Sequence, residues 1–234
     1  MGQVDCSTVT SPLSAGLFDM DGTLIDSEPY WLAAEVELVE SFGGQWSHEK
    51  GIALVGSALW DRATALQHAG VELHQSEIID RLSTSVQRQL DEHIPWRPGA
   101  PEMIAQMLDH GLPTALVTMS FRKNALSIAQ AISAELGREA FGVIVAGNDV
   151  AEPKPNPEAY LTAATRLGVD VNDAVAFEDS VFGAASAFSS GALTIGIPLH
   201  MDIPEIYVDT LWDSMQDKTL DHVHDEWHRR GEHR

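Results

Sequence analysis

Apolar runs of strand length alternate with amphipathic stretches of helix length through the second half of the chain. The runs stop at Gly, Pro or polar clusters, as buried strands do, and the stretches between them carry apolar residues at helical spacing. These repeated strand–helix–strand units predict an α/β fold, a doubly wound parallel sheet of Rossmann-like type with helices on both faces. The predicted strands cover residues 13–18, 113–117, 141–146, 174–177 and 192–197, and the predicted helices cover residues 102–110, 122–136, 157–167 and 183–189.

A long stretch with helical periodicity separates the first predicted strand from the second. It contains three predicted helices, at about residues 29–42, 58–69 and 76–92, and ends in a segment with three prolines in seven residues, Pro95 to Pro101. Such a segment favours a domain boundary. We therefore expect an inserted all-helical domain at residues 30–95 and a core domain made of residues 1–29 and 96–234. Residues 1–12 and 221–234 are expected to be mobile ends, the second of them as a frayed helix or a tail.

The charge balance narrows the possible partners. The chain of 234 residues has 44% hydrophobic residues, which is ordinary for a globular protein, but 14 Lys and Arg stand against 35 Asp and Glu, for a net charge of −21. This balance argues against binding to nucleic acid or to an anionic membrane surface. There is no membrane-spanning apolar run and no recognisable signal peptide, and Cys6 is the only cysteine. We expect a cytoplasmic protein, a monomer or weak dimer, that binds a small molecule.

Polar side chains follow the predicted strands where each one ends. The ends of parallel strands share one edge of a sheet, where ligands collect. Carboxylates gathered there would raise one another's pKa unless a cation lay among them, and a hard ion with oxygen ligands, Mg²⁺, fits best. A metal ion, a lysine and hydroxyl groups around one point indicate a site for a phosphoryl group. The residues concerned are Asp19 and Asp21, Thr118-Met119-Ser120, Lys154 between two prolines, and Glu178-Asp179-Ser180.

Four of these segments resemble the motifs of one family. The run Asp19-Met-Asp-Gly-Thr-Leu-Ile-Asp-Ser-Glu28 resembles the first motif of the haloacid dehalogenase superfamily of phosphohydrolases, and it is highly specific. Leu116-Val-Thr118 resembles the second motif, Lys154 the third and Phe177-Glu-Asp-Ser180 the fourth, in the expected order over residues 15–198. The chain is most similar to the β-phosphoglucomutase-like branch, which includes sugar-phosphate and phosphoglycolate phosphatases. The helical block sits where this family inserts its C1 cap domain.

The resemblance implies a role for each motif residue. Asp19 would attack phosphorus and become phosphorylated, and Asp21 would protonate the leaving oxygen and then activate water. Thr118 and Lys154 would hold the transferring phosphoryl group, with Met119 and Ser120 as further substrate-binding residues. Asp179 would bind Mg²⁺ together with Asp19 and the backbone carbonyl of Asp21, while Glu178 would act through a metal-bound water. The dehalogenases of the superfamily lack an acidic residue at the position of Asp21. In this respect the chain resembles the phosphotransferases of the superfamily.

The resemblance leaves the reaction partly open. In the mutases of this branch a His lies twelve residues after the nucleophile, and here that residue is Trp31. The run Asp26-Ser-Glu-Pro-Tyr-Trp31 is similar instead to bacterial hexose- and hexitol-phosphate phosphatases, so we expect hydrolysis of small sugar or polyol phosphates. The alternatives are a β-phosphoglucomutase-type phosphotransferase, a phosphoglycolate phosphatase and a non-catalytic phosphate-binding protein.

Aromatic and basic residues of the helical block have two interpretations. Trp31, Trp60 and Arg62 are candidates for substrate contacts, although aromatic residues at helical spacing more often belong to a core. The histidines near the C-terminus lack a rigid frame and are interpreted as non-functional.

Overall fold

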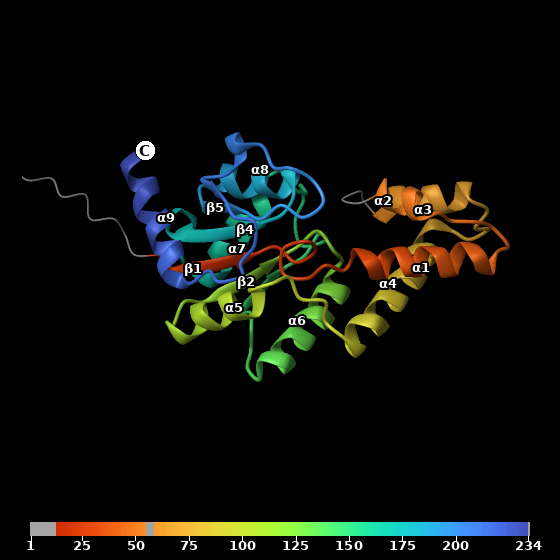
Figure 1. The fold of residues 1–234 in the computed structure, drawn as a ribbon, viewed down its shortest axis with the longest axis horizontal. Helices are drawn as coiled ribbons and strands as arrows, with labels where there is room; N and C mark the ends of the chain where they lie inside the picture. The colour runs from red at the N-terminus through yellow and green to blue at the C-terminus, as the bar shows by residue number, and fades with distance from the viewer. Residues whose placement is uncertain (1–12, 55–58, 234) are drawn as a thin grey trace, which may run out of the picture.

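The computed structural model describes residues 13–54 and 59–233, which form a sheet-bearing lobe and a helical lobe beside it (Figure 1). Within these residues six strands make one parallel sheet in the order β3-β2-β1-β4-β5-β6. The chain therefore builds outward from β1 on one side and then crosses to the other side of β1 at β4. The strands are β1 (Ala15–Phe18), β2 (Thr114–Val117), β3 (Val143–Val145), β4 (Ala174–Glu178), β5 (Leu193–Gly196) and β6 (Thr210–Leu211).

Helices cover both faces of the sheet because its side chains alternate between two apolar cores. Phe18 stacks on Phe177 at a centroid distance of 4.8 Å in the core under α5, α6 and α9, whereas Leu17 lies in a second core, rich in alanine, under α7 and α8. These helices are α5 (Ala100–Asp109), α6 (Arg122–Leu136), α7 (Glu158–Leu167), α8 (Val181–Ser190) and α9 (Leu220–His233), with short 3-10 turns at Val171–Asp173 and Glu205–Tyr207.

The helical insertion between β1 and β2 has its own buried ion pairs. Arg62 donates to Glu35 at 2.8 Å and to Glu28 at 2.8 Å, and Trp46 donates to Glu35 at 2.9 Å. Glu35 is completely buried, and such a charge is tolerated only when it is paired. This network joins α1, α3 and the loop that precedes α2. The helices of the insertion region are α1 (Glu28–Ser41), α2 (His48–Ile52), α3 (Leu59–His68) and α4 (Gln75–Glu92).

The chain enters and leaves the insertion through two adjacent segments. Ile25 and Trp96 form an antiparallel bridge, and the amide of Asp26 donates to the carbonyl of Pro95 at 2.9 Å. The two connections therefore form one short paired segment, the hinge segment, beside the carboxyl edge of the sheet.

The predicted fold class, a doubly wound parallel sheet with an inserted helical domain, is confirmed. The predicted strands and helices recur within a few residues, but α2 and the short edge strand β6 were not predicted because each is too short to show a period. The exact boundaries given for the two domains stay predictions. No helix in the described ranges is long and apolar enough to cross a lipid bilayer.

The C-terminal segment differs from the expected frayed helix or mobile tail. Residues 220–233 form α9, and the side chains of Leu220, Val223 and Trp227 are buried in the larger core. Their spacing of three and four residues places them on one face of the helix, which docks beside α5. The expected mobility of residues 1–12 concerns a stretch outside the described residues.

Trp227→Ala tests the docking of α9. Trp227 is 8% exposed, so its truncation should lower the free energy of unfolding by about 3 kcal/mol through lost burial and a residual cavity. Trp60, which is 48% exposed, provides the matched control, because Trp60→Ala should change stability by no more than about 0.5 kcal/mol. Urea unfolding followed by circular dichroism measures both, and equal effects would contradict a docked α9.

Candidate active site

The predicted site residues come together at the carboxyl ends of β1, β2 and β4. Because β1 lies between the other two, Asp19 after β1 is flanked by Thr118 after β2 and by Glu178 at the end of β4. This is also the point where the strand order reverses direction, the usual location of a ligand in an open parallel sheet.

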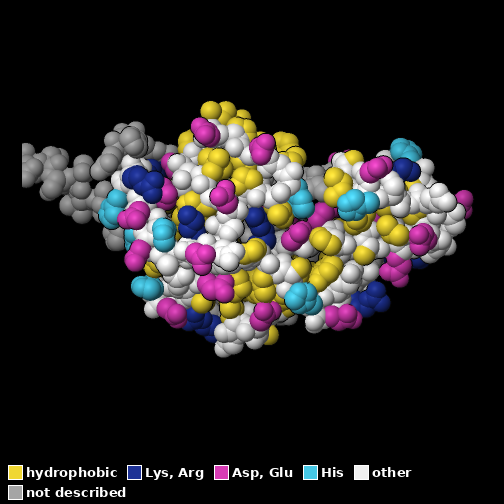
Figure 2. All heavy atoms as spheres, viewed as in Figure 1, with side chains coloured by type: hydrophobic (Ala, Val, Ile, Leu, Met, Phe, Trp, Pro, Cys, Tyr) yellow, Lys and Arg dark blue, Asp and Glu magenta, His cyan; other side chains and the backbone are white. Residues whose placement is uncertain are grey.

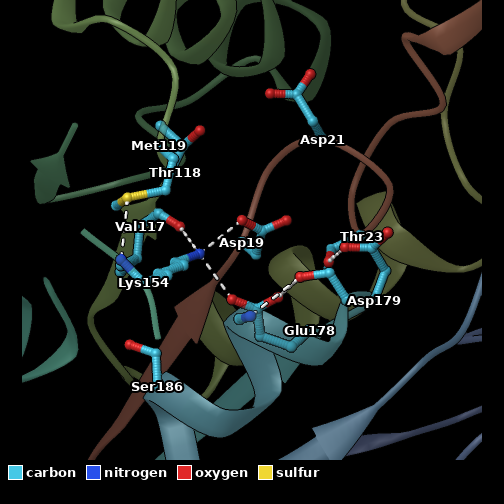
Figure 3. Close-up of polar contacts among 12 residues, drawn as sticks. Asp19, Asp21, Thr23, Val117, Thr118, Met119, Lys154, Glu178, Asp179 and Ser186 are labelled. Carbon is cyan, nitrogen blue, oxygen red and sulfur yellow. Dashed lines mark hydrogen bonds and ion pairs between the residues drawn. The ribbon is translucent and has the colours of Figure 1, made fainter. Parts of the chain in front are cut away.

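Lys154 forms the centre of a buried charge cluster (Figure 3). Its ammonium lies 2.7 Å from Asp19 Oδ1 and 2.7 Å from Glu178 Oε1, and it also donates to the carbonyl of Val117 at 2.9 Å. An ammonium group has three N–H donors, so these contacts use all of them. The side chain of Lys154 is only 5% exposed, which makes its pairing with carboxylates essential.

The carboxylates of the cluster hold more negative charge than Lys154 compensates. Burial, together with the nearby Asp19, raises the pKa of Glu178 to about 7 against the opposing effect of Lys154. Burial and the charges of Asp19 and Glu178 likewise raise the pKa of Asp179 well above its ordinary value. Burial alone would lower the pKa of Lys154, but its two carboxylate partners outweigh burial and raise it. The cluster thus favours a bound proton or a further cation.

Glu178 is held from three sides. Its Oε1 accepts hydrogen bonds from Lys154 and from the hydroxyl of Tyr160, a completely buried residue of α7. Ser180 caps α8 by accepting from the amide of Gly183 at 3.1 Å. A Cβ atom at Gly183 would lie 1.9 Å from Glu178 Oε2, so this first turn of α8 can only pack on the carboxylate with glycine there.

Asp179 lies against the turn that follows Asp21. Gly22 in this turn has φ +86°, and a Cβ atom there would lie 2.0 Å from Asp179 Oδ2. Thr23 donates to Asp179 Oδ1 at 3.4 Å, which is a long hydrogen bond. Glycine is therefore required at position 22 both for its backbone conformation and for the close approach of the carboxylate.

Asp21 is turned away from the cluster. Its carboxyl group accepts from Ser27 at 2.5 Å and from Ser120 at 2.9 Å, and Figure 3 shows it pointing away from Asp19 and Lys154. Burial raises the pKa of Asp21 against the effect of these two hydroxyl groups, and Asp19 raises it further. Ser27 precedes α1 without capping it, and its hydroxyl group donates to Asp21 instead.

The segment after β2 places its three residues differently. Thr118 is buried and its hydroxyl oxygen accepts from the amide of Ser120 at 3.0 Å. Ser120 turns its own hydroxyl group to Asp21. The sulfur of Met119 lies 3.5 Å from the amide of Lys154, so Met119 contacts the lysine segment.

The donor set fits Mg²⁺. Asp19, Glu178 and Asp179 each offer a carboxylate oxygen, and these oxygens all lie within 4.8 Å of one another. Hard cations of this kind prefer oxygen ligands, and the raised pKa values of two of these carboxyl groups show that positive charge would be stabilised here. The carboxyl group of Asp21 does not belong to this group of three.

Sequence reasoning missed two buried polar residues beside the site. Tyr160 falls on the apolar face of a predicted helix, where it is indistinguishable from a core residue. Arg97 falls in the proline-rich boundary segment, where a charged residue suggests solvent, yet it is only 7% exposed.

The candidates in the helical insertion separate into two groups. Trp31 is 8% exposed and lies beneath Arg62, whose guanidinium is 5.7 Å from the indole centroid, so both belong to the packed interior of the insertion. Trp60 is exposed and stays a candidate for a substrate contact.

A parallel sheet that carries a carboxylate–lysine cluster at its carboxyl edge, with helices inserted after the first strand, is the architecture of a Rossmann-like enzyme core with a cap. The chain belongs to the family of haloacid dehalogenase-like hydrolases, whose sequence model matches residues 17–197. The predicted resemblance to this superfamily is confirmed.

Three similar proteins illustrate the relationship. Fructose-1-phosphate phosphatase YqaB of Escherichia coli (strain K12) is 33% identical over 79% of this chain and 97% of its own length. The bifunctional riboflavin kinase/FMN phosphatase of Arabidopsis thaliana is 32% identical over 79% of this chain, which spans 48% of that relative's length. The crystal structure of CbbY from Rhodobacter sphaeroides in complex with phosphate superposes with a TM-score of 0.76 at 30% identity and covers 87% of this chain and 95% of that one. The named phosphatases support the predicted enzyme class, a phosphoric monoester hydrolase.

Glu178→Gln tests the charge imbalance of the metal-free site. The pKa of Glu178 is raised from 4.5 to about 7, so between these values the folded protein keeps a proton that the unfolded chain has lost. Rising pH therefore lowers the free energy of unfolding through this group, with a limiting slope of about 1.4 kcal/mol per pH unit. Urea unfolding in EDTA across this range should give a shallower decline for Glu178→Gln than for the wild type.

The exposed Glu77 of α4 supplies the control for this measurement. Glu77→Gln should leave the wild-type slope unchanged. Parallel slopes for Glu178→Gln and the wild type would show that the Glu178 carboxyl group is not perturbed as described.

Proposed function

We propose that this hydrolase cleaves phosphate monoesters of small sugars or polyols, with Mg²⁺ as cofactor and through a phospho-aspartate on Asp19. The observation that carries the proposal is the cluster in which Asp19 shares Lys154 with Glu178 while Asp179 lies beside them. Such a cluster can direct one carboxylate oxygen at phosphorus and surround the phosphoryl oxygens with positive charge.

Asp19 acts as the nucleophile in this proposal. A carboxylate oxygen of Asp19 forms a bond to phosphorus as the bond from phosphorus to the ester oxygen breaks. Lys154 and the buried hydroxyl group of Thr118 hold the phosphoryl oxygens, with Met119 and Ser120 in the adjoining segment of the substrate site. Since Lys154 donates to Asp19, Glu178 and Val117 in the structure, it must share or exchange a donor when it contacts a phosphoryl group.

Asp21 acts first as acid and then as base. Its raised pKa favours the protonated carboxyl group, which gives its proton to the departing ester oxygen. The resulting carboxylate then takes a proton from the water that attacks the phospho-aspartate, which releases phosphate and restores Asp19. Both steps require the side chain of Asp21 to leave Ser27 and Ser120 and turn toward Asp19.

The proposed Mg²⁺ ligands are the carboxylates of Asp19 and Asp179 and the backbone carbonyl of Asp21, with Glu178 acting at longer range. When bound, the ion would neutralise negative charge on the phosphoryl oxygens and on these carboxylates. Asp19 has two oxygens and can serve Lys154 with one while the other faces the cation.

The preference for a sugar or polyol ester rests on the named relatives, and on the helical insertion where the resembling family has its cap domain.

The surface charge of the protein does not attract such a substrate from a distance. Acidic side chains are spread over both lobes on the face shown in Figure 2, so an anionic substrate gains no long-range attraction from the surface. Attraction must then be local, at Lys154 and the metal ion.

The cytoplasmic location and the monomeric or weakly dimeric state stay predictions.

Hydrolysis is favoured over a mutase reaction by the residue at position 31. A mutase must retain the phospho-aspartate until a second hydroxyl group attacks. The mutases of the β-phosphoglucomutase-like branch carry a His at this position. Trp31 has no titratable group and is packed in the interior of the insertion, so it cannot replace that His in proton transfer.

Asp19→Asn should abolish turnover while the fold persists. The substitution keeps the shape of the side chain but removes the nucleophilic carboxylate, so kcat should fall by about a thousandfold or more. Phosphate release from an aryl phosphate in Mg²⁺ measures the loss, and circular dichroism checks the fold. Asp109→Asn, at an exposed position that pairs with Arg138, is the control expected to retain activity. Wild-type turnover by Asp19→Asn would contradict the nucleophile assignment.

A panel of phosphate esters tests the substrate class. Hexose 6-phosphates and hexitol phosphates should release phosphate in Mg²⁺ and not in EDTA, and faster than phosphoglycolate does. β-Glucose 1-phosphate should be hydrolysed or left intact. Its conversion to glucose 6-phosphate without phosphate release would establish the mutase alternative, and absence of any reaction would favour a phosphate-binding protein.

A further inference from the structure

Arg97 is a buried arginine without a carboxylate partner among the hydrogen bonds of the described residues. It lies on the segment that returns from the helical insertion to the sheet-bearing lobe, and it is 7% exposed. Its guanidinium donates to three backbone carbonyls, those of Gly22 at 2.5 Å, Ile197 at 2.7 Å and Pro198 at 3.2 Å. Its own amide donates to the carbonyl of Leu24 at 2.8 Å.

These carbonyls belong to loops on the two sides of β4. Gly22 follows β1 and Ile197 follows β5, and β4 lies between β1 and β5 in the sheet. The amide of Ile197 also donates to the carbonyl of Glu178 at 2.7 Å. Arg97 therefore joins the loops that flank the end of β4, where Asp179 begins the next segment.

The contact with Gly22 reaches the site most directly. Gly22 is pressed against Asp179 closely enough that a Cβ atom would overlap the carboxylate, and Arg97 holds the carbonyl of the same residue. Gly22, the residue that follows Asp21, is thus held between the carboxylate of Asp179 and the guanidinium of Arg97. A planar guanidinium suits this task because its fixed fork of donors can bind several carbonyls at once, whereas an ammonium group binds as a point charge.

We infer that Arg97 is a positioning residue of the active site, which holds the backbone after Asp21 and the loop after β5 so that Asp179 and the Asp21 carbonyl keep the spacing a divalent cation needs. This inference rests on the proposed function for the role of the cation. It assigns to the hinge segment of the insertion a direct part in organising the site, beyond connecting the two lobes.

Arg97→Lys tests the inference because it keeps the positive charge and removes the planar fork. The dissociation constant for Mn²⁺, measured from the electron paramagnetic resonance of the free ion, should rise by about 10- to 100-fold, as for other residues that orient metal ligands. In phosphatase assays the Mg²⁺ concentration for half-maximal rate should rise in parallel, with little change in KM for the ester at saturating Mg²⁺. Arg62→Lys is the matched control, since Arg62 is also buried but lies within the insertion, and it should keep wild-type Mn²⁺ affinity.

Wild-type Mn²⁺ affinity in Arg97→Lys, with only the midpoint of thermal unfolding lowered, would overturn the inference and leave Arg97 a purely structural residue. Arg97→Gln, which keeps an amide donor, is judged by the same two outcomes if the lysine variant does not fold. A wild-type protein that binds no Mn²⁺ and hydrolyses no ester would instead contradict the proposed function itself.

Discussion

The contact of one ammonium group with two carboxylates, Lys154 with Asp19 and Glu178, is the interaction on which the carboxyl edge of the sheet depends. Buried charges of this kind are strongly destabilising unless they are paired and hydrogen-bonded. The fold meets this requirement by aligning the ends of β1, β2 and β4, and by supplying the carbonyl of Val117 and the hydroxyl group of Tyr160 as additional partners. The alanine-rich packing of α7 and α8 against the sheet brings Tyr160 and the first turn of α8 to the carboxylate.

The charged groups of the cluster have hydrogen-bond partners, but the negative charge of the carboxylates exceeds the positive charge of Lys154. Three carboxylates lie near one lysine, and burial together with the mutual repulsion of these carboxylates raises the pKa values of Glu178 and Asp179. Excess negative charge of this kind favours the binding of a cation, as proposed for Mg²⁺. Gly22 and Gly183 are needed for a steric reason, because each lets a carboxylate approach the backbone at a distance that any side chain would prevent.

The helical insertion is linked to this chemistry through its two short connections. On the entering connection Ser27 donates a hydrogen bond to Asp21, and on the returning connection Arg97 binds the turn that follows Asp21. Any movement of the insertion relative to the sheet acts on both residues. The buried pairing of Arg62 with Glu28 and Glu35 ties two helices of the insertion, α1 and α3, to one another.

The sequence by itself determined the parallel α/β fold, the helical insertion and the residues at the strand ends, because these follow from local periodicity and from short motifs. It could not show that Asp21 turns away from Asp19, that α9 docks on the core, or that Tyr160 and Arg97 serve the site. Each of these depends on contacts between distant positions, such as Arg97 with Gly22 and Ile197, which are 75 and 100 residues away. A buried tyrosine on a helix and an arginine between prolines have the same local pattern whether or not they reach a functional group. Only the tertiary structure decides which polar partner each of them meets once it is removed from water.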